Sequence, residues 1–292
     1  MKTRFNNRHR AIRILLICSC TFFTVPSAAK TRIACIGNSI TYGYGVNRNE
    51  AYPYRLQQLL DTADYTVQND GVNAITLLKN GDNPYYRNGK LPDVFTLQPD
   101  IITIKLGTND TKPQNWDAHN QEFKADYLWL IDTLSDMASQ PQIWLVLPVP
   151  VFKHPTADSW GIRDSILQKI IPIIQEIAAE RQLPLIDANT PLQAFPQFFS
   201  VDGVHPNAEG LDTIAHIIYR ALKAATATTP PVAARYNTAA HNDRFASGIN
   251  FPVFNLQSEK TRYLDLAGRK MNHRELPSAH WKTFYRWHIS SK

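Results

Sequence analysis

The sequence predicts an α/β fold in which helices cover both faces of a five-stranded parallel sheet. Short apolar runs of the length of a buried strand occur five times, and stretches with the 3.6-residue periodicity of amphipathic helices separate them. This alternation favours parallel strands, because each helix returns the chain to the edge of the sheet from which the next strand starts. Strands are expected at residues 33–36, 65–69, 100–106, 142–147 and 185–187.

The helices between these strands are predicted from apolar residues three and four positions apart. Pro53 fits the first turn of the first helix, whereas Pro172 lies inside the longest one and should kink or split it. Asn207 is a suitable N-cap for the last helix. A further helix is expected to begin within residues 74–78, before a loop rich in Gly, Asn and Pro at 81–89. The other helices are expected at residues 52–60, 91–97, 123–137, 162–181 and 208–223.

The N-terminal segment has the composition of a secretory signal peptide. Residues 1–13 carry five basic side chains and no acidic one, and the apolar run at 14–26 is shorter than the roughly 20 residues that span a bilayer. The small residues Ser27, Ala28 and Ala29 follow, as a signal peptidase requires. We therefore expect residues 1–29 to be removed and the protein to be secreted or periplasmic in a bacterium, without a stable membrane span. Lipoprotein anchoring at Cys20 is the alternative.

Composition divides the rest of the chain into a body and a tail. Residues 30–225 form the predicted globular domain, and residues 226–234, rich in Ala, Thr and Pro, form a linker. Residues 235–292 are basic and aromatic, so a C-terminal tail or small β module is expected there. The net charge of +6 arises at the two ends, since residues 30–229 carry 16 basic and 21 acidic residues. The basic balance therefore gives no support for a nucleic-acid partner.

Cysteine usage predicts neither a disulfide nor a metal centre. Cys18 and Cys20 leave with the signal peptide, and Cys35 remains in the first predicted strand. The sequence contains no group of Cys and His residues with the spacing of metal ligands. We therefore expect neither a metal nor an organic cofactor.

Polar residues and glycines follow four of the predicted strands at their carboxyl ends. Ser39 follows the first strand, Gly71 the second and Asn109 the third, while Asp202 and His205 follow the fifth. The carboxyl ends of parallel strands lie at one edge of the sheet, where such folds bind ligands. Each residue alone has an ordinary explanation as a helix cap, a turn or a loop residue. Their placement at one edge indicates a site.

These residue types fit nucleophilic catalysis. Ser39 becomes a nucleophile when His205 takes its proton, and Asp202 would fix the tautomer of that imidazole. One loop can present both Asp202 and His205, because only two residues separate them. The oxyanion of a tetrahedral intermediate needs fixed donors, and the backbone N–H groups of Ser39 and Gly71 and the side-chain amide of Asn109 would supply them.

The segments that carry these residues resemble the four blocks of the SGNH (GDSL-like) hydrolase superfamily, over about residues 31–223. The resemblance implies a flavodoxin-like three-layer α/β/α sandwich and ester hydrolysis by Ser39, His205 and Asp202. Two positions depart from the family pattern: Asn38 stands where the name-giving motif has Asp, and Ala74 where many members have glycine. The blocks are Gly37-Asn38-Ser39-Ile40, Gly71, Gly107-Thr108-Asn109-Asp110 and Asp202-Gly203-Val204-His205-Pro206.

Further segments resemble one branch of this family, the secreted bacterial carbohydrate O-acetylesterases of the sialate O-acetylesterase-like and acetylxylan esterase-like types. An acetylated carbohydrate is therefore the expected substrate. Aromatic residues in these segments could stack on a sugar face, although loop packing also explains them, and asparagines could bind sugar hydroxyl groups. The segments are Tyr52-Pro53, Asp82-Asn83-Pro84-Tyr85, Lys112-Pro113-Gln114-Asn115-Trp116 and Pro148-Val149-Pro150. The candidate substrate-binding residues are Asn83, Tyr85, Tyr86, Asn115 and Trp116.

The resulting hypothesis is a secreted serine esterase that removes O-acetyl groups from a carbohydrate through an acyl-enzyme on Ser39. One alternative is a lipolytic esterase or thioesterase of the same family, which would prefer longer acyl chains. Another is a non-catalytic carbohydrate-binding protein, which would have no need of Asp202 and His205 together. The predicted partner is the carbohydrate substrate, and no oligomeric state is assigned.

Overall fold

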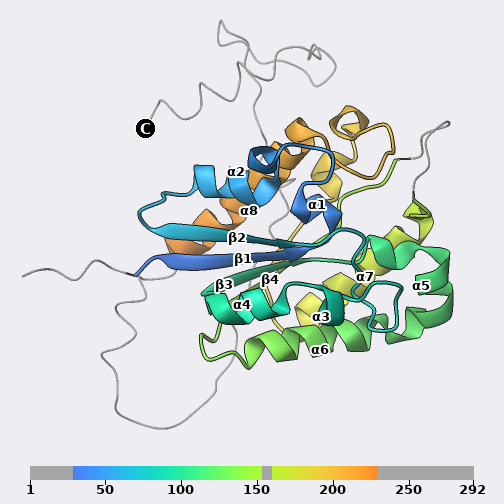
Figure 1. Cartoon of the computed structure of the whole chain (residues 1–292), viewed down its shortest axis with the longest axis horizontal. Coiled ribbons are helices and arrows are strands. Elements are labelled where there is room, and N and C mark those ends of the chain that lie inside the picture. The colour runs from blue at the N-terminus through green and yellow to red at the C-terminus, as the bar shows by residue number, and fades with distance from the viewer. Residues whose placement is uncertain (1–28, 153–159, 229–292) are drawn as a thin grey trace, which may run out of the picture.

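Five parallel strands form the central sheet, in the order β2-β1-β3-β4-β5 (Figure 1). The computed structural model describes residues 29–152 and 160–228. The predicted signal peptide before Ala29, the predicted linker beyond Thr228 and the predicted tail lie outside these residues. The predicted strands are confirmed, with bounds of β1 (Thr31–Gly37), β2 (Tyr65–Gly71), β3 (Ile101–Lys105), β4 (Gln142–Val146) and β5 (Leu185–Ile186).

Each face of the sheet has its own apolar core, because side chains alternate along every strand. Ile33 and Cys35 of β1 belong to the core under α2 and α8, whereas Ala34 and Ile36 belong to the core on the opposite face. The first layer contains α1 (Ser39–Tyr42), α2 (Tyr52–Leu59) and α8 (Ala208–Thr228). The second contains α3 (Tyr85–Asn88), α4 (Leu91–Leu97), α5 (Pro113–His119), α6 (Phe123–Ser135) and α7 (Asp164–Glu180). The three-layer prediction is therefore confirmed (Figure 1).

Short 3₁₀ turns complete the connections between these elements. They are η1 (Arg48–Glu50), η2 (Asn109–Thr111), η3 (Asn120–Glu122), η4 (Thr190–Leu192) and η5 (Pro196–Phe198). Asn207 accepts the Gly210 N–H at 3.0 Å and so caps the start of α8, as predicted. The helix then continues to Thr228, beyond the predicted start of the linker.

Residues 74–78, where the sequence predicts the start of a helix, form an irregular loop instead. The Asp110 carboxylate accepts the N–H groups of Leu77 and Leu78, at 3.1 and 2.8 Å. Thr76 donates its N–H to the Asn83 carbonyl at 2.8 Å. These N–H groups already have acceptors outside the segment, so a helical turn would add no hydrogen bond for them. Burial raises the pKa of Asp110 to about 6, although the two N–H groups act to lower it.

Two other local differences involve proline. Helix α7 contains Pro172 and is nevertheless one element, so the prediction that this residue could split it is wrong. Helix α5 was not predicted, and it begins at Pro113, where the missing backbone N–H costs no helical hydrogen bond.

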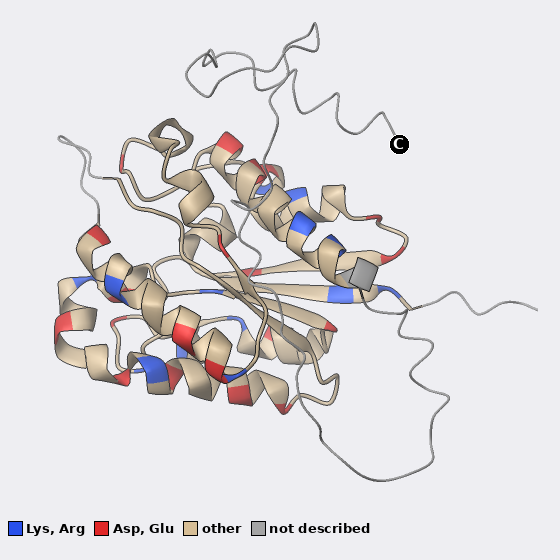
Figure 2. Ribbon diagram, turned by 180° about the vertical axis from the view of Figure 1, so that it is seen from behind, with Lys and Arg blue, Asp and Glu red and all other residues tan. Residues whose placement is uncertain are grey.

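Charged residues of both signs are interspersed over the helices that flank the sheet (Figure 2). No helix within residues 29–152 and 160–228 has the length and apolar character needed to cross a membrane.

Candidate active site

Ser39 lies at the carboxyl end of β1, in the first turn of α1. Asn38 is the N-cap of this short helix, and its Oδ1 accepts the Ile40 N–H at 3.0 Å. Asn38 stands where the family motif has Asp, and it caps the helix as an Asp could. The Ser39 N–H is at the open start of α1, where helical N–H groups have no partner inside the helix.

The structure brings Ser39, His205 and Asp202 together in one line of hydrogen bonds. Ser39 Oγ lies 2.9 Å from His205 Nε2, and His205 Nδ1 lies 2.6 Å from Asp202 Oδ2. When Nδ1 carries the ring proton, His205 donates to Asp202 and can accept the hydroxyl proton of Ser39 through Nε2. This arrangement has the geometry that a serine nucleophile and its general base require.

The loop that carries Asp202 and His205 turns at Gly203. This glycine has a φ of +68°, and a Cβ at its position would lie 1.7 Å from the Phe152 carbonyl oxygen. Only glycine fits such a turn. Gly203 therefore allows the loop to fold tightly enough for Asp202 to reach the ring of His205.

Asp202 is held as a carboxylate by hydrogen bonds to both of its oxygens. Oδ1 accepts the Ser200 hydroxyl at 2.7 Å and the N–H groups of Val204 and His205 at 2.8 and 2.9 Å. Burial alone would raise the pKa of Asp202, but the bonds from His205, Ser200 and Val204 outweigh it and lower the pKa well below its ordinary value. A charged Asp202 stabilises the imidazolium that forms when His205 accepts a proton.

Asn109 follows β3 and lines the pocket beside Ser39. The side-chain Nδ2 of Asn109 donates to the Ile75 carbonyl at 2.9 Å, and the main-chain carbonyl of Asn109 accepts Asn115 Nδ2 at 2.9 Å. One N–H of the side-chain amide is therefore engaged, while an amide group has two. No bond from the second N–H is found among the described residues, and the oxyanion role of Asn109 stays a prediction.

Gly71 does not lie where the predicted oxyanion role would need it. Its N–H donates to Asn69 Oδ1 at 3.0 Å, and it is still part of β2, paired with Gly37. A Cβ at Gly71 would lie 2.2 Å from the Tyr42 backbone nitrogen. Glycine is thus required here for the close approach of α1 to β2, and we correct the oxyanion assignment on this ground.

Ala74 lies in the loop after β2 and, with its neighbour Asn73, lines the pocket next to Ser39. Its φ is +58°, a left-handed conformation that residues other than glycine adopt rarely. Among the described residues, no acceptor is found for its N–H. The sequence did contain a signal, because Ala74 is where many family members carry glycine. Ala74, and not Gly71, is therefore the candidate donor from this loop.

The pocket beside Ser39 has a volume of about 160 Å³. Four of its lining residues, Tyr44, Asn73, Trp160 and Ile162, lie in none of the segments singled out from the sequence. They come from the loop after α1, the loop after β2 and the turn before α7, which share no motif. The full lining is Ser39, Tyr44, Asn73, Ala74, Thr108, Asn109, Lys112, Trp160, Ile162, Val204 and His205.

None of the five predicted substrate-binding residues lines this pocket. Tyr85 is buried and donates its hydroxyl to the Asp70 carbonyl at 3.0 Å. Trp116 is buried and packs against Phe123, with ring centroids 5.8 Å apart. Asn115 is fully buried, and besides bonding Asn109 it accepts the Asp82 N–H at 2.8 Å. These side chains support the loops around the site instead of facing a ligand.

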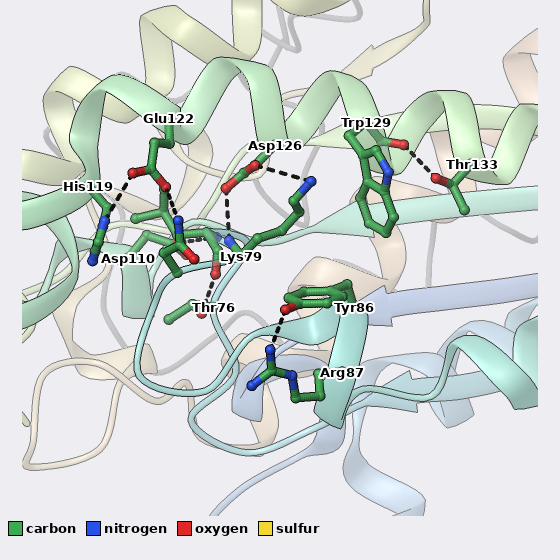
Figure 3. Close-up of polar contacts among 12 residues, drawn as sticks. Thr76, Lys79, Tyr86, Arg87, Asp110, His119, Glu122, Asp126, Trp129 and Thr133 are labelled. Carbon is green, nitrogen blue, oxygen red and sulfur yellow. Dashed lines mark hydrogen bonds and ion pairs between the residues drawn. The ribbon is translucent and has the colours of Figure 1, made fainter.

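Tyr86 lies on α3 and faces Trp129 of α6 (Figure 3), and Asn83 lies in the loop before α3. The Tyr86 ring meets Trp129 at 5.9 Å between centroids, and Lys79 lies over the same indole at 4.5 Å. Asn83 donates to the Asn73 carbonyl at 3.2 Å. Neither residue lines the pocket beside Ser39, and their role as sugar contacts stays a prediction.

The described residues include no group of three or more His, Cys, Asp or Glu side chains placed to hold a metal ion. Cys35 is fully buried in β1, and burial raises the pKa of its thiol to about 12. A thiol in this state is a poor nucleophile.

Residues 35–212 match the GDSL-like Lipase/Acylhydrolase family. The match covers more than half of the chain, and the chain belongs to this family. The predicted family is thereby confirmed.

Individual relatives agree with this assignment. The chain is similar to an acetylxylan esterase from Xylanibacter ruminicola, with 37% identity over 218 residues, which covers 68% of this chain and 44% of the relative. The chain thus spans less than half the length of that curated relative. It is also similar in fold to a carbohydrate acetylesterase family member from Sinorhizobium meliloti, with a TM-score of 0.54, 20% identity and coverage of 66% of this chain and 98% of that chain. The aryl esterase from M. smegmatis gives a TM-score of 0.52, 20% identity and coverage of 66% and 99%.

Proposed function

We propose that this protein is a serine esterase that removes O-acetyl groups from a carbohydrate through an acetyl-enzyme intermediate. The observation that carries the proposal is the hydrogen-bonded line from Ser39 Oγ through the His205 ring to the Asp202 carboxylate. The name of the acetylxylan esterase relative supports the acetylated carbohydrate as substrate class.

The first half of the reaction forms the acetyl-enzyme. His205 Nε2 takes the hydroxyl proton as Ser39 Oγ attacks the acetyl carbonyl carbon, and Asp202 stabilises the imidazolium. The tetrahedral oxyanion accepts hydrogen bonds from the N–H groups of Ser39 and Ala74 and from the Asn109 amide. The intermediate then collapses, the bond from the carbonyl carbon to the sugar oxygen breaks, and His205 returns its proton to that oxygen.

The second half regenerates the enzyme by hydrolysis. Water attacks the acetyl carbon of the Ser39 ester while His205 Nε2 accepts a proton from the water. The second tetrahedral intermediate collapses to acetate, and Ser39 Oγ takes the proton back from His205. No other reactant is needed, because water supplies both the oxygen that acetate gains and the proton that the sugar alcohol carries away.

The size of the pocket supports a short acyl group. It is small, at about 160 Å³, and apolar side chains of Ala74, Ile162 and Val204 line it. A lipolytic esterase would need a longer apolar channel for its acyl chain. This lining can accept an acetyl group, and the series of p-nitrophenyl esters decides between the acetylesterase and the lipolytic alternative.

Export is part of the proposal and rests on the first 29 residues. Their basic start, short apolar run and small residues at 27–29 are typical of a cleaved signal peptide. Cell fractionation with N-terminal sequencing of the mature chain tests this: a new N-terminus near Lys30 outside the cytoplasm is expected. Retention of Met1 in the cytoplasmic fraction would contradict it.

Hydrolysis of p-nitrophenyl esters from acetate to octanoate tests the esterase proposal, with Ser39→Ala as the blank. Highest kcat/KM on acetate, and release of acetate from acetylated xylan, are the expected results. A preference for longer chains would favour the lipolytic alternative. Binding of xylan without hydrolysis of any ester would favour the carbohydrate-binding alternative.

A further inference from the structure

Trp160 lies beside the catalytic pair although it is not part of any recognised block. Its indole Nε1 donates to Asp202 Oδ2 at 3.3 Å, the same oxygen that accepts the His205 ring at 2.6 Å. The side chain remains 53% exposed, so burial of apolar surface does not explain why the indole lies here. The hydrogen bond to Asp202 gives this position a chemical reason.

The backbone at Trp160 is held in an unfavourable conformation. Its φ is +58°, in the left-handed region, which bulky residues seldom adopt. Residues in such conformations persist only where the surrounding structure enforces them, and they gather at functional sites. The conformation places the indole at the edge of the pocket, between Asp202 and the loop after α1.

Tyr44 contacts the catalytic pair from that loop. Its ring centroid lies 4.6 Å from that of His205, and its backbone N–H donates to the Ser39 carbonyl at 2.9 Å. The rings of Tyr44 and Trp160 meet edge to face, with centroids 6.3 Å apart and an interplanar angle of 84°. The two rings therefore touch each other while one contacts His205 and the other Asp202.

We propose that Trp160 is a positioning residue for the esterase reaction and acts through Asp202 and Tyr44. Its N–H restrains the Asp202 carboxylate while that carboxylate orients His205, and its ring supports Tyr44 against the imidazole. These contacts restrain the His205 ring from turning away from Ser39 Oγ. A restrained catalytic base spends more time in the geometry that proton transfer requires. The proposal rests on the proposed function, since it concerns the same three catalytic residues.

The test separates the indole N–H from the indole ring by means of Trp160→Phe. Trp129→Phe makes the same chemical change at a half-buried tryptophan on α6, where the ring packs against Tyr86, and serves as the matched control. Tyr44→Leu removes the aromatic contact with His205. Urea unfolding of each variant shows whether the fold is retained.

We expect Trp160→Phe to lower kcat on p-nitrophenyl acetate about tenfold with KM unchanged, because a hydrogen bond to a charged group is lost. Tyr44→Leu should also lower kcat, whereas Trp129→Phe should match the wild type. Wild-type kcat in Trp160→Phe would overturn the proposal. A rise in KM confined to an acetylated sugar, with kcat unchanged, would also overturn it and make Trp160 a substrate contact.

A proton NMR measurement keeps this test independent of esterase activity. The proton that His205 Nδ1 shares with Asp202 Oδ2 gives a resonance downfield of the backbone amides, and loss of the second donor to Oδ2 should shift it in Trp160→Phe. An unchanged resonance in that folded variant would contradict the proposal. If the resonance shifts while no variant, wild type included, hydrolyses any ester, the proposed function fails and the positioning contact stands.

Discussion

Lys105 allows a quantitative prediction about stability. It is the last residue of β3, pairs with Gly37 next to the nucleophile loop and is 1% exposed. No hydrogen-bond partner for its Nζ is found among the described residues. Burial lowers the pKa of this amine from 10.5 to about 7. We therefore expect Lys105→Met to stabilise the fold, and to do so most strongly at low pH.

The sign and size follow from the two pKa values. Between pH 7 and 10.5 the unfolded chain binds the proton more tightly than the folded protein, so the cost of Lys105 grows as the pH falls. Below pH 7 the cost is complete, and the difference between the two pKa values corresponds to about 5 kcal/mol. At pH 9 the same relation leaves about 2 kcal/mol, and above pH 10.5 almost nothing.

Urea unfolding of the wild type and Lys105→Met at pH 6 and pH 9 measures this effect. Methionine is unbranched and fills a similar space, and any packing change it causes is the same at both pH values. The gain in unfolding free energy of the variant should therefore be about 3 kcal/mol larger at pH 6 than at pH 9. An equal difference between the two proteins at both pH values would refute the reasoning, since it would mean that Lys105 stays charged in the fold.

Three further predictions concern the site itself. Asn109→Ala should lower kcat about 100- to 1,000-fold with little change in KM, because an oxyanion donor is lost; a rise in KM alone would show that the amide binds the ground state and the transition state equally. Gly203→Ala should lower the melting temperature and the activity together, because the new Cβ meets the Phe152 carbonyl at 1.7 Å; wild-type melting would contradict this. Asp202 has a pKa below its ordinary 3.8, so its contribution to stability is present above that value and is lost as the pH falls through the lower pKa of the folded state. The unfolding free energy of Asp202→Asn should accordingly fall less steeply in acid than that of the wild type. The same pH dependence in both proteins would show that the hydrogen bonds to the Asp202 carboxylate do not stabilise the fold.

The strands could be predicted because they are buried on both faces. In the run from Ile101 to Lys105, every residue but the last is β-branched, and local composition suffices to identify such a strand. The failure at residues 74–78 has a different cause. Asp110 satisfies the backbone of that loop from a distant point of the chain, and no local pattern reports such a contact.

The candidate site was predictable to the extent that its residues follow strands. Ser39, Asn109 and His205 lie at strand ends or on the loop after the last strand, and the topology alone brings them to one edge. The misplaced oxyanion donor shows the limit of this reasoning, because Gly71 is still inside β2 and the chain reaches the pocket only at Asn73 and Ala74.

The substrate-facing residues were beyond the reach of the sequence. Aromatic side chains in loops can face the core as readily as a ligand, and Tyr85 and Trp116 are buried. Tyr44 and Trp160, which do line the pocket, meet only because two loops far apart in the sequence fold against each other. Such proximity depends on tertiary structure and leaves no motif in either loop.

Trapping the covalent intermediate tests the central claim most directly. Wild-type protein mixed with p-nitrophenyl acetate, quenched in acid within the first turnover and digested, should yield the peptide containing Ser39 with one added acetyl group. The same peptide from Ser39→Ala should carry none, and that protein should not turn over the ester. An acetyl group on another residue, or full turnover by Ser39→Ala, would contradict the account.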